Sequence, residues 1–288
     1  MQLHVRYLCS FNYHDPVRES HNLLRVCPAE TPTQRLLSFD LHIEPSARLL
    51  TYVDYWGTRV DAFGIRHPHD QLLVAATSLI ETDAPVQPDE YDVPFSSYRS
   101  DEVRRGFAEY LQETRHTSTG ARLMSMAADA IGSDMSALEA LVALEAALTG
   151  PMRYEPGSTF VGVDVNEVLE QGAGVCQDFA HLLMAGCRSV GIPARYVSGY
   201  LYEGTESEFE VEAQTHAWME AFIPGWGWFG IDPTNPGGVG DLHVKIGHGR
   251  DYDDVPPLRG LFHGTGTHDL GVSVRISKGT LSAISDQQ

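Results

Sequence analysis

The chain has 288 residues, of which 42% are hydrophobic and 20% charged, so it is long enough for one large or two ordinary globular domains. Acidic residues outnumber basic ones by 39 to 20, and the formal net charge is -19. A nucleic-acid groove or an anionic membrane surface attracts clustered Lys and Arg, which this sequence lacks, so we expect neither partner.

The first part of the chain, residues 1–82, is expected to form an N-terminal β-sandwich domain. Apolar and polar residues alternate with period two in residues 3–8 and in residues 33–45, where the phase slips once. Residues 58–65 and 70–81 are further strand candidates, separated by segments rich in Pro and Gly. Several short strands with turns between them are typical of a β-sandwich.

No targeting signal stands at the start of the sequence. Residues 1–10 alternate in polarity and lack the basic start and continuous apolar run of a signal peptide. No stretch approaches the roughly 20 apolar residues of a membrane span. We therefore expect a cytoplasmic protein that does not bind membranes.

An acidic, Pro-rich linker is predicted over residues 83–99. Its first twelve residues, DAPVQPDEYDVP, hold three prolines and four acids but no basic residue. Such a composition resists packing, and prolines stiffen a linker. The remainder, residues 100–288, is predicted to be the catalytic domain.

Helical signals come first in this second domain, and strands follow. Helices are expected behind Ser100, between Ser133-Asp134 and Gly150-Pro151, after Asp164 with Glu167 at capping-box spacing, and over about residues 175–190. Strands are then expected from Ala194 to Tyr202, together with a hairpin in residues 214–235 that turns at Pro224-Gly225. Helices followed by strands indicate an α+β domain.

Cys176 is the cysteine whose position suggests chemistry. The chain has four cysteines, without a Cys-x-x-Cys pair, so neither a zinc ribbon nor a disulfide framework is indicated. Cys176 follows Gly172 and Gly174 and stands at the predicted start of a helix, where unpaired N–H groups favour a thiolate. A buried, inert thiol is the alternative, because free cysteine is among the most buried residue types.

Two residues of the predicted hairpin are candidates for the partners of this thiol. His216 and Asp232 are equidistant from residue 224 and should lie opposite each other, within one residue. An Asp beside a His can fix its tautomer and stabilise the imidazolium, as in a nucleophile–base–orienter triad. A purely structural His–Asp pair remains open. His181 lies about 140° around the helix from Cys176 and is assigned to packing or surface.

The stretches GVCQDFAHLLMAGCRSVGIPARYVSGYL and THAWMEAFIPGWGWFGIDPTN resemble the bacterial transglutaminase-like family of papain-like cysteine enzymes. A later stretch, KIGHGRDYDDVPPLRGLFHG, is similar to the segment after the family's core, and the first 90 or so residues are more weakly similar to its N-terminal β domain. The resemblance implies a papain-like core with Cys176 as nucleophile, His216 as base and Asp232 as orienter. Trp218 and Gly174 are the candidate substrate contacts.

The predicted function is therefore cysteine-dependent acyl transfer that cleaves peptide or isopeptide bonds through a thioester. The substrate would be a peptide or protein amide, and we expect no cofactor and no metal. Three questions remain open: whether water or an amine accepts the acyl group, whether the fold is a non-catalytic scaffold, and whether the chain forms a homo-oligomer. In a true transglutaminase Trp218, Trp226 and Trp228 would wall the acceptor tunnel, although alternating aromatics in a hairpin also suit a core.

Histidine-rich and acidic segments are weaker candidates for metal sites. The HPHD segment at 67–70, together with His14, His21 and His42, lacks the register of a metal site. The later histidines, His243, His248, His263 and His268, are irregularly spaced. Residues 249–254, GRDYDD, lack the spacing of an EF-hand, so the sequence does not indicate a calcium site.

Overall fold

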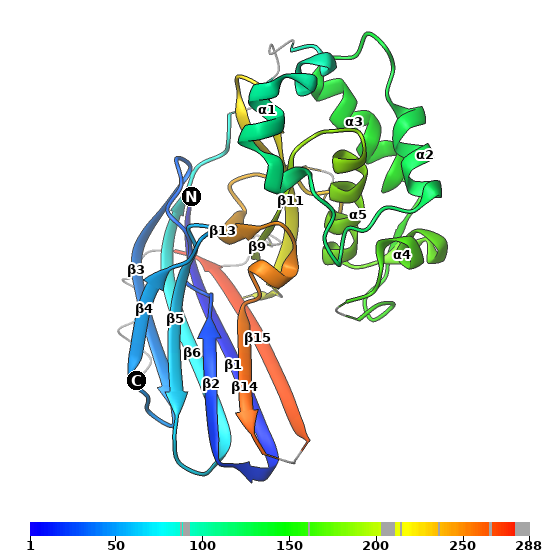
Figure 1. The fold of residues 1–288 in the computed structure, drawn as a ribbon. Coiled ribbons are helices and arrows are strands. Elements are labelled where there is room, and N and C mark those ends of the chain that lie inside the picture. Colours follow the sequence, from blue (N-terminus) through cyan, green and yellow to red (C-terminus); the bar gives the residue numbers. More distant parts are fainter. Residues whose placement is uncertain are drawn as a thin grey trace.

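The structure is a computed structural model that describes residues 1–86, 88, 93–160, 162–202, 211–213, 215–235, 237–264 and 267–279. It confirms the mixed α+β class. Figure 1 shows long strands packed as an elongated body at one end and the helices gathered at the other. Among the described residues no helix is both long and apolar enough to cross a bilayer.

The elongated body is a sandwich of two antiparallel sheets. The order in the first sheet is β10 (Val211–Ala213), β15 (His268–Lys278), β1 (Gln2–Val17), β6 (His69–Thr82) and β3 (Gln34–Glu44). The order in the second is β14 (Leu258–His263), β2 (Glu19–Leu24), β5 (Arg59–Ile65) and β4 (Leu49–Val53). One apolar core contains residues from both sheets, so the sheets pack face to face.

The alternation in the sequence explains how these strands pack. Along β1 every second residue from Leu3 to Cys9 is buried, because side chains alternate between the two faces of a strand. The slip of phase predicted for β3 corresponds to an irregularity in its register with β6 between Leu36 and Ser38. A bulge of this kind shifts the inward-facing set by one residue.

The predicted domain boundary is wrong at the C-terminal side. Strand β15 pairs with β1 along its length, from Leu3 opposite Lys278 to Tyr13 opposite His268, and β14 pairs with β2. The last strands therefore complete the sandwich instead of belonging to the catalytic domain. Turn and strand signals show that a strand exists, but they do not identify its distant partner.

The linker is shorter than predicted. Residues Phe95–Arg99 form a 3-10 helix, and Tyr98 is buried in the helical core with Phe95 packed beside it. Part of the expected linker, residue 87 and residues 89–92, lies outside the described residues. In the described part, the two aromatic side chains pack against the helical core and end the linker before residue 99.

The helices are α1 (Asp101–Gly106), α2 (Ala121–Ala130), α3 (Ala137–Leu148), α4 (Val165–Gln171) and α5 (Cys176–Ser189). Ser100 caps α1 and Asp164 caps α4, as predicted. The cap of α3 is Ser136, which forms a capping box with Glu139, and not the predicted Ser133-Asp134. Helix α2 carries no cap hydrogen bond from a side chain and was not expected from the sequence.

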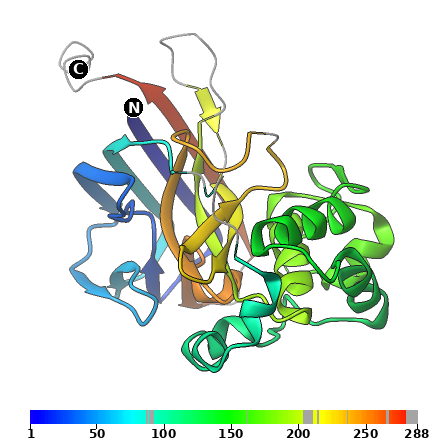
Figure 2. The ribbon, with the colours of Figure 1, turned by 90° about the horizontal axis from the view of Figure 1, so that it is seen from above.

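A third sheet joins the two parts of the molecule. Its order is β12 (Gly227–Ile231), β11 (Thr215–Ile223), β9 (Ala194–Leu201) and β13 (His243–Gly249). Figure 2 shows this sheet between the helices and the sandwich. Ala217, Met219 and Ala221 share a core with α5, whereas Tyr200 and Val244 share a core with the sandwich. We call it the central sheet; the remaining strands, β7 (Arg153–Tyr154) and β8 (Ala173–Gly174), form a short parallel pair.

Candidate active site

Cys176 is the first residue of α5, close to the predicted helix start. Val175, in extended conformation, precedes the helix, and its carbonyl accepts from the backbone N–H groups of Asp178 and Phe179. The first N–H groups of a helix have no partner within it, so those of Cys176 and Gln177 stay open for other acceptors. The helix N-terminus thus presents both a thiol and unpaired donors.

Asp178 holds this helix start in place. Its buried carboxylate accepts from the Val175 N–H at 2.8 Å and from the hydroxyl of Thr159. A Cβ added at Gly174 would lie 2.8 Å from the Asp178 Cβ, which is closer than real Cβ contacts. Gly174 is therefore needed so that Asp178 can pack against the turn, and it does not line the groove beside Cys176. Its substrate contact stays a prediction.

A groove of about 650 Å³ runs past Cys176. Its lining includes Gln177 from α5, Tyr196 and Ser198 from β9, and His216 from β11, together with Asn235 beyond β12. Cys176 is partly exposed, while Cys9, Cys27 and Cys187 are buried, and none of the four forms a disulfide. Among the four thiols, the predicted nucleophile is thus the accessible one.

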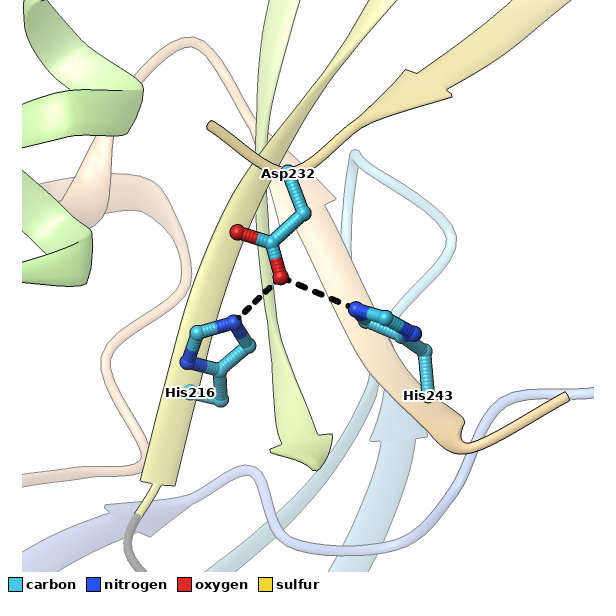
Figure 3. Close-up of side chains that lie close together, drawn as sticks. All are labelled: His216, Asp232 and His243. Carbon is cyan, nitrogen blue, oxygen red and sulfur yellow. Dashed lines mark hydrogen bonds and ion pairs between the residues drawn. The ribbon is translucent and has the colours of Figure 1, made fainter. Parts of the chain in front are cut away.

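His216 and Asp232 lie together, although the hairpin register differs from the prediction. Met219 pairs with Ile231 and Ile223 with Gly227, which centres the hairpin on residue 225 instead of 224. Asp232 follows the last residue of β12 and lies diagonally from His216 on the same face. The His216 Nε2 and Asp232 Oδ2 atoms are 2.7 Å apart (Figure 3).

The Asp232 carboxylate is surrounded by donors. Its Oδ2 accepts from His216, from the His243 Nε2 at 2.9 Å and from the Asn235 Nδ2 at 2.7 Å, and its Oδ1 accepts from the backbone N–H and hydroxyl of Thr234. Burial alone would raise the pKa of Asp232, but these hydrogen bonds and the His216 charge hold it far below its usual range. Asp232 is therefore ionised at neutral pH.

His216 connects the thiol to this carboxylate. Burial disfavours its charge, but hydrogen bonds to Asp232 and to Cys176, with the charges of both, outweigh burial and raise its pKa to about 9. Because the Nε2 atom of His216 contacts Asp232, the other ring nitrogen, Nδ1, is the one available to the Cys176 thiol. The structure thus brings the three residues together, because His216 lines the groove with Cys176 and is hydrogen-bonded to Asp232.

His243 is the residue of this cluster that the sequence did not reveal. It comes from β13, and its ring lies on the opposite side of Asp232 from His216 (Figure 3). Its Nδ1 accepts from the backbone N–H of Gly240, so a neutral His243 carries its proton on Nε2 and donates it to Asp232. The irregular spacing of the late histidines gave no signal, because the pairing of β13 with β9 brings His243 to the site.

Among the residues that the structure describes, two groups of side chains have the residue types that bind metals. His216, Asp232 and His243 form one, and His116, Asp251 and Asp253 the other. In the first, each atom that a metal would need already has a hydrogen bond within the cluster or to the thiol. This arrangement suits proton handling, and we assign it no metal.

Comparison with known proteins identifies the family. Residues 125–233 match the model of the transglutaminase-like superfamily, and residues 3–81 match the bacterial transglutaminase-like N-terminal region. An uncharacterised protein of Mycobacterium leprae is 35% identical over 279 residues, covering 96% of this chain and 99% of the relative. The chain belongs to the transglutaminase-like superfamily.

Within the transglutaminase-like superfamily, the chain also resembles one solved structure over its whole fold and one enzyme over part of its sequence. A crystal structure from Cytophaga hutchinsonii, named a "putative cysteine protease", has a TM-score of 0.74 at 22% identity, covering 98% of this chain and 94% of the other, which establishes the shared papain-like fold. A protein-glutamine gamma-glutamyltransferase of Pseudomonas aeruginosa is 32% identical over 106 residues, which is 32% of this chain and 15% of that protein.

The other residues singled out in the transglutaminase-like stretches lie away from the groove. Trp218 is buried, stacks 6.1 Å from the His216 ring and lines a different cavity, and its substrate contact stays a prediction. His181 is buried and stacks on Tyr196, and burial lowers its pKa well below the usual value, which leaves it neutral. Its assignment to helix packing is confirmed.

Proposed function

We propose that the protein is a cysteine enzyme that cleaves amide bonds of peptides or proteins by acyl transfer, with Cys176, His216 and Asp232 as its triad. The observation that carries the proposal is the position of His216, which lines the same groove as Cys176 and is hydrogen-bonded to the buried carboxylate of Asp232. A His held this way can exchange a proton with the sulfur and with a leaving group.

The reaction follows from these positions. The Cys176 sulfur attacks the amide carbonyl carbon, and the open N–H groups at the start of α5 stabilise the oxyanion. His216 donates its proton to the departing amine as the C–N bond breaks, which leaves a thioester. Water, deprotonated by His216, then releases the acid and regenerates the thiol. Asp232 keeps the imidazole oriented and stabilises its charged form.

Hydrolysis is favoured over transfer to an amine by the aromatic side chains around the site. Trp218, Trp226 and Trp228, which would wall an acceptor tunnel, line a separate cavity and not the groove beside Cys176. The partial match to a glutamyltransferase supports transfer as the second candidate. Incorporation of a labelled amine into a glutamine-containing protein would establish transfer, whereas release of free acid without amine dependence would establish hydrolysis.

Alkylation with iodoacetamide tests the nucleophile without knowledge of the substrate. At pH 6 an ordinary thiol with a pKa near 8.5 is only about 0.3% thiolate. If His216 stabilises the Cys176 thiolate, labelling at pH 6 should be at least several-fold faster than in the denatured chain. Cys187 should stay unlabelled, because burial raises its pKa to about 12.

The matched variants are Cys176→Ala, which should lose all rapid labelling, and His216→Gln, which should slow it about 10-fold at pH 6. Peptide mapping by mass spectrometry locates the label. Native Cys176 that reacts no faster than the denatured chain at every pH from 5 to 9 would show that the fold is a non-catalytic scaffold.

A further inference from the structure

A second cavity lies behind the triad, between the central sheet and loops of the sandwich. Its volume is about 690 Å³, and it is bounded by residues 29–34, 56–58 and 83–86 on one side and by β9, β11, β12 and β13 on the other. Cys176, His216 and Asp232 do not line it. It is therefore a space separate from the groove.

All four tryptophans of the chain line this cavity: Trp56, Trp218, Trp226 and Trp228. They come from a sandwich loop and from both strands of the hairpin. Trp218 is buried, whereas Trp226 is 37% exposed. Indole rings offer large flat apolar surfaces, and ligand sites typically combine such walls with a few fixed polar groups.

The charged groups on the inner wall of the cavity are two cations, Arg195 and Lys245, and one carboxylate, Glu220. Both oxygens of Glu220 are taken, by Arg195 at 2.5 Å and by Lys245 at 2.7 and 2.8 Å, so this carboxylate offers little to a ligand. Two cations around one anion leave a net positive charge, and the Lys245 ammonium keeps a third donor. The Arg195 guanidinium covers the Trp228 ring at 4.0 Å, which fixes both side chains.

Neighbouring groups do not neutralise this charge. His248 lies 3.1 Å from Arg195, and burial and the adjacent cations lower its pKa to about 3, so it is neutral. The acids Glu30 and Asp83 lie on the exposed rim.

Among the described residues, the Trp218 indole N–H is buried and has no hydrogen-bond partner. A buried donor without an acceptor is costly, and native structures rarely leave one.

We propose that this cavity binds a small carboxylate with a flat apolar part. The carboxylate supplies the acceptor atoms that the inner wall lacks and balances the charge of the Arg195–Glu220–Lys245 cluster. The apolar part packs on the tryptophan rings nearer the rim. Glu30 and Asp83 at the mouth disfavour ligands with further negative charges, which selects monoanions.

The test compares two probes that differ only in charge, 3-phenylpropanoate and 3-phenylpropanamide. Binding is measured by calorimetry and by tryptophan fluorescence, since every tryptophan lines the cavity. We expect the acid to bind and the amide to bind at least 10-fold more weakly. Cys176→Ala should bind the acid as the wild type does, which separates this site from the groove and from the proposed catalysis.

Two substitutions complete the test. Lys245→Met removes the excess charge but leaves the Arg195–Glu220 pair, and Trp226→Leu removes the ring of a tryptophan that is 37% exposed. Each should weaken binding of the acid at least 10-fold, with folding checked by circular dichroism. Equal binding of acid and amide, no binding of the acid, or unchanged affinity in Trp226→Leu would overturn the proposal.

Discussion

Substituting Asn for Asp232 keeps the shape of the side chain but turns one acceptor atom into a donor. Every polar group around Asp232 donates to it: two imidazoles, the Asn235 amide, and the Thr234 N–H and hydroxyl. An amide NH₂ in place of either oxygen therefore faces at least one N–H. Leaving a buried donor unpaired costs about 1–3 kcal/mol, so Asp232→Asn should be destabilised by at least that much.

The loss should also depend on pH, because His216 is charged only while Asp232 supports it. A pKa raised from 6.5 to about 9 means that His216 contributes stability that is complete below pH 6.5 and lost as the pH rises through 9. The full contribution is about 3 kcal/mol. Asp232 supplies the largest favourable part of this shift, so the variant should retain less than half of it.

Urea unfolding at pH 6, 7.5 and 9.5, followed by far-UV circular dichroism, measures this effect. The difference in unfolding free energy between the wild type and Asp232→Asn should be about 2 kcal/mol larger at pH 6 than at pH 9.5. Asp253→Asn, at an exposed acid outside the triad, serves as the control for a lost carboxylate. A difference that is the same at both pH values would refute the charged His216–Asp232 pair.

Three further predictions concern stability. Gly174→Ala should destabilise the fold by about 1–3 kcal/mol and slow Cys176 alkylation, because the new Cβ displaces Asp178; chemical denaturation and labelling measure both. Arg188→Met removes the donors of four hydrogen bonds, two of them buried and two part-buried, and should cost about 3 kcal/mol, seen as a lower Tm, whereas an unchanged Tm would contradict this. His243→Leu should be less stable than His243→Gln by about 1.5–3 kcal/mol, because only Gln can still donate to the buried carboxylate.

Local signals in the sequence predicted most of the site. The glycines before Cys176 and the apolar run after it placed the helix start close to its observed position, and the Pro224-Gly225 turn placed His216 near Asp232. These features depend on residues close together in the chain. The predicted hairpin register was wrong, because turn chemistry does not fix which residue is central: the hairpin is centred on residue 225 and not on residue 224.

Long-range strand pairing explains what the sequence did not reveal. His243 reaches Asp232 only because β13 adds to the far side of β9, and no local pattern indicates that neighbour. Trp218 was a candidate substrate contact through the family resemblance, whereas its spacing from His216 shows only that both lie on one face of β11. The surroundings of that face come from sandwich loops more than 100 residues earlier.

The pairing of β1 with β15 has a consequence for how the chain folds. Leu3 must find Lys278, and β2 must find β14, across the whole length that forms the helices and the central sheet. Loop closure over such a distance is entropically unfavourable until the intervening part is compact. We therefore expect the helices and the central sheet to become compact before the sandwich closes, and a fragment ending before β14 to leave two strand edges unpaired and prone to aggregate.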